Sequence, residues 1–241
     1  MKDWFKDWFA SEFYLKVYSH RNDIDAKNLI NLITQNIPLS ENSYILDAAC
    51  GNGRHAKQFA ELGHKVIGFD LSLNLLKIAQ YHSVNNLNFF CADIRNMYLK
   101  REFDLILNLF TSFGYFDTDD ENSLFVKYAS NHITQNGYFV LDYLNPIYVK
   151  DNLVTNSHKV VNNYNIEENR IIKNKRVEKE IIISSDDDLH RFYESVRLYS
   201  YNEIVNIFSR YGFRVLKTFG NYLGDKYIEK TSERMIFIFK K

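Results

Sequence analysis

Residues 44–60 read YILDAACGNGRHAKQFA, and this stretch decides the fold class of the chain. Its opening segment, residues 44–48, is dominated by apolar side chains and predicts a buried strand. The segment Gly51-Asn52-Gly53 predicts a turn. After the turn, alanine and phenylalanine within residues 56–60 recur at the spacing of one helical face. A strand, a glycine turn and a helix in this order predict an α/β unit.

The same alternation continues along the chain. We expect a strand at residues 65–69, a helix that begins after the N-cap Ser72, and further strands at 88–91, 104–107 and 138–141. Short apolar strands separated by helices predict a doubly wound parallel sheet, with helices on both faces.

A polar residue stands at or just after the end of each expected strand. These residues are Asp47, Asp70, Asp93, Asn108 and Asp142. Ligands of parallel α/β sheets bind beyond the carboxyl ends of the strands. We therefore expect all five side chains at the mouth of one crevice.

The other segments surround this sheet. Residues 1–40 carry aromatic residues at helical spacing and predict an N-terminal helical lid. Residues 150–198 contain charged, β-rich runs and predict a small antiparallel insertion. The α/β domain then comprises residues 41–149 and 199–241, and its second part opens with a helix that Ser200 caps.

Composition excludes several classes of protein. The 241 residues are 46% hydrophobic and carry 30 basic and 30 acidic side chains, which argues against disorder and against a strongly basic nucleic-acid face. No apolar run approaches the ~18 residues of a membrane span. The two cysteines form no CxxC motif, so we expect a reducing cytoplasm. No histidine pair has the spacing and neighbours of a metal site, so we expect no metal.

The acids at the strand ends distinguish between cofactors. A carboxylate at Asp47, close to the glycine turn, would repel a pyrophosphate but suits a ligand that presents an ammonium and a sulfonium. Asp70 is placed to accept two hydrogen bonds from ribose hydroxyls. Asp93 and the apolar Ile94 suit the amino group and the face of an adenine. The three acids favour S-adenosylmethionine over a nicotinamide dinucleotide.

The motifs also resemble a known family. Residues 45–56 are similar to the first motif of class I S-adenosylmethionine-dependent methyltransferases, and residues 70–72 and 92–95 to the second and third. Residues 108–116 resemble the fourth motif of a bacterial small-molecule-type subgroup. Segments at both ends of the chain also match that subgroup. The resemblance implies a Rossmann-like sheet of seven strands with the last strand antiparallel.

The resemblance assigns the cofactor-binding residues. It places Asp47 near the methionine end, Asp70 on the ribose, and Asn108 with Leu109 beneath the methionine moiety. Arg21 is the candidate for the methionine carboxylate. The full predicted set is Tyr14, Tyr18, Arg21, Asp47, Ala49, Gly51, Asp70, Leu71, Asp93, Ile94, Asn108 and Leu109. For Tyr14, Tyr18 and Arg21, a purely structural helix remains the alternative.

The expected activity is transfer of a methyl group to nitrogen or oxygen of a small molecule by in-line displacement, which relies on alignment and needs no acid–base pair for an amine. Phe110, Tyr115, Arg197 and Tyr222 are the expected acceptor-site residues. For Arg197, a salt bridge on a strand surface is the alternative to anchoring an anionic acceptor. The rival functions are methylation of RNA or protein, nicotinamide-dependent oxidoreduction, and cofactor binding without catalysis.

Overall fold

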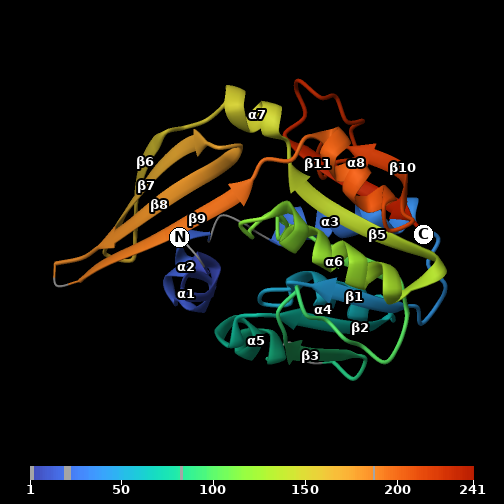
Figure 1. The fold of residues 1–241 in the computed structure, drawn as a ribbon. Helices are drawn as coiled ribbons and strands as arrows, with labels where there is room; N and C mark the ends of the chain where they lie inside the picture. Colours follow the sequence, from blue (N-terminus) through green and yellow to red (C-terminus); the bar gives the residue numbers. More distant parts are fainter. Residues whose placement is uncertain (1–2, 19–22, 82–83, 187) are drawn as a thin grey trace.

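The computed structural model describes residues 3–18, 23–81, 84–186 and 188–241. Over these residues the chain forms one seven-stranded sheet and one four-stranded sheet (Figure 1). The large sheet contains β1 (Tyr44–Ala48), β2 (Lys65–Asp70), β3 (Leu87–Cys91), β4 (Phe103–Asn108), β5 (Ile133–Leu144), β10 (Arg214–Phe219) and β11 (Arg234–Lys240).

The strand order of the large sheet is β10-β11-β5-β4-β1-β2-β3. The five strands β1 to β5 pair in parallel, whereas β11 pairs antiparallel with both β5 and β10. The prediction of a Rossmann-like seven-stranded sheet with an antiparallel last strand is therefore confirmed. Nearly every residue of β1 and β4 is buried, as expected for strands covered on both faces.

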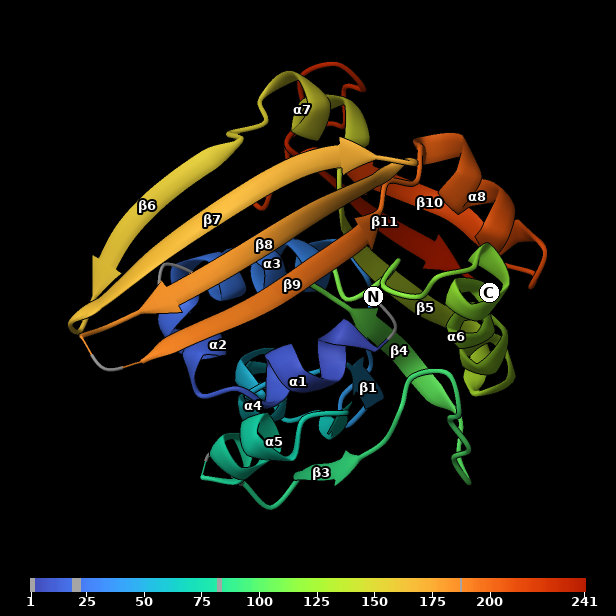
Figure 2. The ribbon, with the colours of Figure 1, turned by 60° about the vertical axis from the view of Figure 1, so that its left-hand side comes forward.

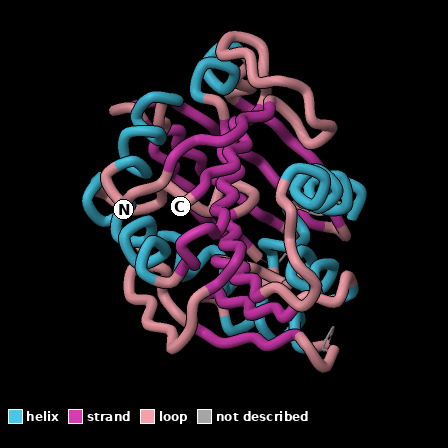
Figure 3. The backbone as a smooth tube through the Cα atoms, turned by 90° about the vertical axis from the view of Figure 1, so that its right-hand side faces the viewer, coloured by secondary structure: helices cyan, strands magenta, loops and turns pink. Residues whose placement is uncertain are grey.

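Helices cover both faces of this sheet (Figure 3). On one face, α3 (Asp23–Asn36) and α4 (Arg54–Glu61) bury Leu29 and Phe59 against Ile45. On the other face, α6 (Asp119–Asn131) and α8 (Tyr201–Ser209) bury Phe125 and Phe208 against Phe139. Burial of these apolar faces is the main force that holds the layers together.

Local capping explains where several helices begin. The Ser72 hydroxyl accepts a hydrogen bond from the Leu75 N–H and starts α5 (Leu73–Gln80), which packs on β2 and β3. Ser200 and Glu203 form a reciprocal capping box at the start of α8. Both caps agree with the sequence prediction. Asn145 likewise caps α7 (Pro146–Asp151), which leads out of the large sheet.

The second sheet consists of β6 (Asn156–Val161), β7 (Tyr164–Lys173), β8 (Arg176–Ser184) and β9 (Leu189–Arg197), all antiparallel. Two short helices, α1 (Trp4–Ala10) and α2 (Phe13–Val17), lie beside one face of it (Figure 2). Trp8 and Phe13 form an apolar cluster there with Ile166, Ile181 and Ile183. The N-terminal helices therefore pack between the second sheet and the α/β domain, because α1 also contacts α5.

Candidate functional site

A cavity of about 340 Å³ lies at the carboxyl ends of β1 and β2 and beside the loops that follow β3 and β4. Most of the predicted cofactor residues line it: Tyr14, Tyr18, Asp47, Ala49, Gly51, Asp70, Leu71, Asp93, Ile94 and Leu109. Asn108 is buried and is not among the lining residues; its side-chain amide donates to the Ala48 carbonyl at 3.2 Å. Arg21 lies outside the described residues.

The turn after β1 depends on left-handed backbone. Ala49, Gly51 and Gly53 have φ of 58°, 58° and 76°. A Cβ added to Gly53 would stand 2.6 Å from the Phe89 ring, whereas one added to Gly51 would meet no atom within 4 Å. Gly53 thus permits close packing of α4, and Gly51 keeps space open at the cavity wall.

Asp47, which lines this cavity, has one carboxyl oxygen without a hydrogen-bond partner. The side chain is buried and its Oδ2 atom has no hydrogen-bond partner. Burial, and to a smaller extent the nearby Asp70, raise the pKa of Asp47 to about 7, although a backbone hydrogen bond from Ala56 opposes the shift. A buried carboxylate oxygen of this kind is stabilised when a cation or a donor reaches it.

Asp70 holds the turn together. Its Oδ2 accepts from the Gly51 N–H and its Oδ1 from the Ser72 N–H, both at 2.8 Å. Burial raises the pKa of Asp70, and the backbone donors oppose the shift. A carboxylate has about four acceptor positions, so these backbone bonds leave capacity for a ligand hydroxyl.

Asp93 stands two residues beyond the end of β3, in the loop that lines the cavity. The Arg95 guanidinium binds its carboxylate, with 2.7 Å between Nη2 and Oδ2. Burial raises the pKa of Asp93, but the hydrogen bonds from Arg95 outweigh it, so the pKa lies below the ordinary value. Asp93 is therefore ionised at neutral pH.

A second cavity, of about 210 Å³, adjoins the first. Five aromatic residues line both cavities: Phe9, Tyr14, Tyr18, Phe110 and Tyr115. Two of these, Phe110 and Tyr115, are predicted acceptor-site residues. The second sheet contributes Arg170, Lys179 and Glu194 to the wall of the second cavity. The aromatic side chains therefore stand between two adjoining spaces.

Sequence reasoning missed the charged residues of the second sheet. Glu194 accepts a hydrogen bond from Trp8 Nε1 at 2.6 Å and forms an ion pair with Lys179 at 2.7 Å. The available signal was the alternation of Lys179 with Ile181 and Ile183, which places a lysine on the apolar face of β8.

Asp142 differs from the prediction. We expected it at the mouth of the crevice, but it lies inside β5 and is fully buried. Its Oδ1 accepts from Arg234 Nε at 2.7 Å, and its Oδ2 accepts from the Phe110 N–H and the Tyr222 hydroxyl. Asp142 thus fixes the loop after β4, where Phe110 and Thr111 both have positive φ.

Two predicted acceptor-site residues do not line either cavity. The Tyr222 ring stacks on Phe110, which lines both cavities, with 5.4 Å between centroids. The Arg197 guanidinium lies 3.1 Å from Glu203 and 3.3 Å from Asp119. Arg197 therefore takes part in salt bridges, which is the alternative to a role as an anion anchor.

Most of the residues that line the first cavity lie in a segment that resembles known proteins. Residues 45–137 match the family described as "Methyltransferase domain". A dTDP-3-amino-3,4,6-trideoxy-alpha-D-glucopyranose N,N-dimethyltransferase of Streptomyces venezuelae is 28% identical over 118 residues, which are 49% of this chain and 48% of that protein. A ubiquinone biosynthesis O-methyltransferase of Pelagibacter ubique is 29% identical over 108 residues, or 44% of this chain and 43% of that protein. The chain thus matches these relatives over about half of their length or less.

Likeness in fold extends over nearly the whole chain. The crystal structure of an S-adenosylmethionine-dependent methyltransferase from Clostridium acetobutylicum has a TM-score of 0.80 at 23% identity, covering 95% of this chain and 96% of that chain. The prediction of the class I methyltransferase fold is confirmed. Among the described residues, no helix is long and apolar enough to cross a membrane.

Proposed function

We propose that this chain, whose residues 45–137 match a methyltransferase-domain family, transfers the methyl group of S-adenosylmethionine to a small molecule. The acceptor atom in this proposal is nitrogen or oxygen. Two of the relatives named above, a sugar N,N-dimethyltransferase and an O-methyltransferase of ubiquinone biosynthesis, carry names of small-molecule enzymes, and this supports the small-molecule class.

The unpartnered Oδ2 of Asp47 carries the proposal. Asp47 lines the first cavity. Gly51 leaves space at the wall of this cavity, and Asp70 lines it at the end of the neighbouring strand β2. An ammonium group at Asp47, a ribose at Asp70 and an adenine between Asp93 and Ile94 would satisfy these groups together. Two adjacent buried carboxylates make the same position unfavourable for a pyrophosphate.

The residues of the chain would act mainly by orientation. When bound, S-adenosylmethionine supplies a methyl group that its sulfonium already activates. Five aromatic side chains line both cavities and would exclude water between cofactor and acceptor: Phe9, Tyr14, Tyr18, Phe110 and Tyr115. Holding an acceptor in the second cavity would contribute up to about 7–11 kcal/mol to lowering the barrier.

Two titratable side chains of the cavities, His55 and Glu194, favour an amine as the acceptor. A deprotonated amine needs no base, whereas a hydroxyl does. His55 lines the first cavity, but burial, helped by the nearby Arg54, lowers its pKa to about 3. Glu194 faces the second cavity, but it already accepts bonds from Trp8, Tyr18 and Lys179. Neither group is suited to take a proton from a hydroxyl.

The test is a transfer assay with matched acceptors. The protein is incubated with S-adenosylmethionine and a panel of small amines, the corresponding alcohols, a bulk RNA and an unfolded protein, and release of S-adenosylhomocysteine is measured. We expect release with one or more amines. Release with RNA or protein alone would contradict the small-molecule assignment, and no release with any class would favour a cofactor-binding protein without catalysis.

A further inference from the structure

The N-terminal helices are hydrogen-bonded to a single carboxylate of the second sheet, that of Glu194. Trp8 Nε1 donates to Glu194 Oε1 at 2.6 Å, and the Tyr18 hydroxyl donates to the same carboxylate at 2.5 Å. Trp8 is fully buried, and Trp8 and Glu194 are 186 positions apart in the sequence. One side chain of β9 therefore fixes a residue of α1 and the residue that follows α2.

Lysine and glutamate residues on the neighbouring strands complete this arrangement. Lys179 forms ion pairs with Glu194 at 2.7 Å and with Glu168 at 3.3 Å, and its ammonium also donates to the Tyr18 hydroxyl. Burial acts to raise the pKa of Glu194. The ion pair with Lys179 and the hydrogen bonds that Tyr18 and Trp8 donate outweigh this effect, so the pKa of Glu194 lies below its ordinary value. Glu194 thus remains an anion, and a charged acceptor makes strong hydrogen bonds to Trp8 and Tyr18.

The opposite side of the N-terminal helices touches the strand ends of the first cavity. The Ser72 hydroxyl donates to the Phe9 carbonyl at 2.6 Å, and Ser72 N–H is itself a donor to Asp70. The helices therefore bridge the proposed ribose-binding residue and the second sheet. A displacement on the Glu194 side would move the Tyr18 ring, which lines both cavities.

We propose that Glu194 is a positioning residue for the methyl-transfer site: through Tyr18 and Trp8 it holds the aromatic boundary of the first cavity in place. Glu194 lines only the second of the two cavities, yet it sets the affinity of the first for the cofactor. This inference rests on the proposed function, because it concerns binding of the same cofactor. It adds that the second sheet and the cofactor cavity are energetically coupled through one carboxylate.

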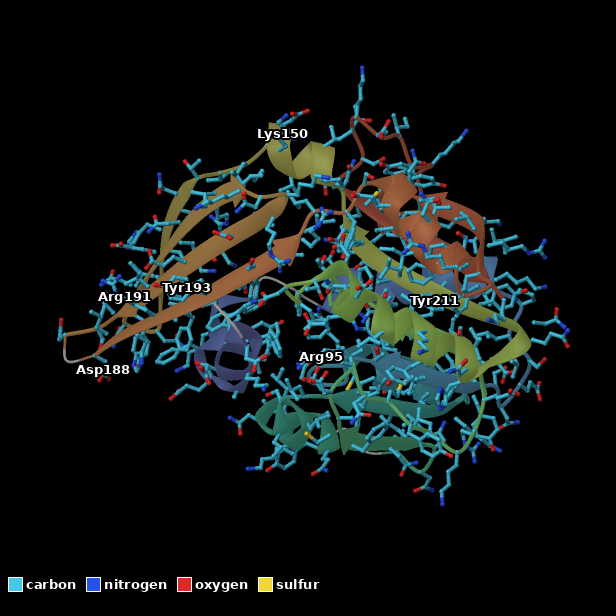
Figure 4. The ribbon with its side chains drawn as sticks, in the orientation of Figure 1. Arg95, Lys150, Asp188, Arg191, Tyr193 and Tyr211 are labelled. Atoms are coloured by element: carbon cyan, nitrogen blue, oxygen red, sulfur yellow. The ribbon has the colours of Figure 1, made fainter. Side chains whose placement is uncertain are left out.

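The same sheet contains a matched control. Glu180 follows Lys179 on β8, so its side chain points to the opposite face. It accepts from Arg191 at 3.3 Å and from the Tyr193 hydroxyl at 3.1 Å, and Arg191 and Tyr193 are labelled on the second sheet in Figure 4. Glu180 thus also binds a cation and a tyrosine, but it lines neither cavity.

The experiment measures S-adenosylhomocysteine binding by calorimetry, and the melting temperature, for the full chain and for Glu194→Gln, Tyr18→Phe and Glu180→Gln. We expect the Kd to rise about tenfold for Glu194→Gln, which loses charge-assisted hydrogen bonds, and severalfold for Tyr18→Phe. The double variant Glu194→Gln/Tyr18→Phe should bind no more weakly than Glu194→Gln alone, because the two residues act as one unit. Glu180→Gln should bind as the unmodified chain does.

The outcomes separate this inference from the proposed function. If the unmodified chain binds and Glu194→Gln binds as tightly as Glu180→Gln, the positioning role is overturned while the proposed function stands. A lower melting temperature without a change in Kd would also overturn it, since that is the result for a merely structural residue. If Glu194→Gln does not fold, an unchanged Kd for Tyr18→Phe overturns the positioning role, because that variant lacks the hydroxyl that donates to Glu194. If the unmodified chain does not bind, both proposals fail.

Discussion

The two glycines of the turn after β1 should respond differently to the same substitution. Gly51 and Gly53 both have left-handed backbone, which costs an alanine about 1–2 kcal/mol relative to glycine. At Gly51 there is no further stability cost, because an added Cβ meets no atom within 4 Å. That Cβ would, however, occupy space at the wall of the cofactor cavity.

At Gly53 the added Cβ would overlap an aromatic side chain. It would stand 2.6 Å from the Phe89 ring and 3.0 Å from the Ala79 Cβ, so this ring would have to shift. Overpacking of this kind adds about 1–3 kcal/mol. Gly53→Ala should therefore lower the free energy of unfolding by about 2–5 kcal/mol, against about 1–2 kcal/mol for Gly51→Ala.

Thermal unfolding and calorimetry test this contrast. In a chain of this size, 1 kcal/mol shifts the melting temperature by about 2–4 °C, so Gly53→Ala should melt well below Gly51→Ala. Gly51→Ala should instead lose at least about tenfold in S-adenosylhomocysteine affinity, equivalent to about 1.4 kcal/mol. Unchanged affinity for Gly51→Ala, or equal melting temperatures for the two variants, would refute the geometry assigned to the turn.

The remaining predictions concern three charged residues. Asp70→Ala should lose most of the affinity for S-adenosylhomocysteine, and calorimetry that shows unchanged binding would count against the ribose assignment. The pKa of Asp47 is raised to about 7 in the folded chain, so the folded state holds a proton that the unfolded chain releases. The free energy of unfolding should therefore fall as the pH rises from about 4 to about 7. Asp47→Asn should flatten this dependence in urea unfolding without ligand, and an identical slope in the variant would contradict the assignment. Arg197→Gln should lower the melting temperature, because it removes salt bridges to Glu203 and Asp119. It should leave cofactor affinity unchanged. Weaker binding would show that Arg197 acts at the site.

Local signals in the sequence predicted much of the fold. The strand β1, its glycine turn and the cap at Ser72 depend on residues within a few positions of one another, and the structure places them as expected. The same local signal led to the wrong position for Asp142. An aspartate is rare within a buried strand, so the pattern predicted that β5 ended before it.

Long-range pairs account for what the sequence did not predict. Asp142 is tolerated inside β5 because Arg234, 92 positions later, and Tyr222 bind its carboxylate. Glu194 and Trp8 are brought together only when the second sheet packs on the N-terminal helices. Composition and periodicity do not encode such partners, since each residue on its own has the pattern of an ordinary surface or core position.

We infer that the cavity at the ends of β1 and β2 binds a sulfur-containing nucleoside. The most direct measurement is a pair of calorimetric titrations of the unmodified chain, one with S-adenosylhomocysteine and one with NAD. We expect one-to-one binding of S-adenosylhomocysteine, with much weaker or undetectable binding of NAD. Tight binding of NAD without binding of S-adenosylhomocysteine would contradict it.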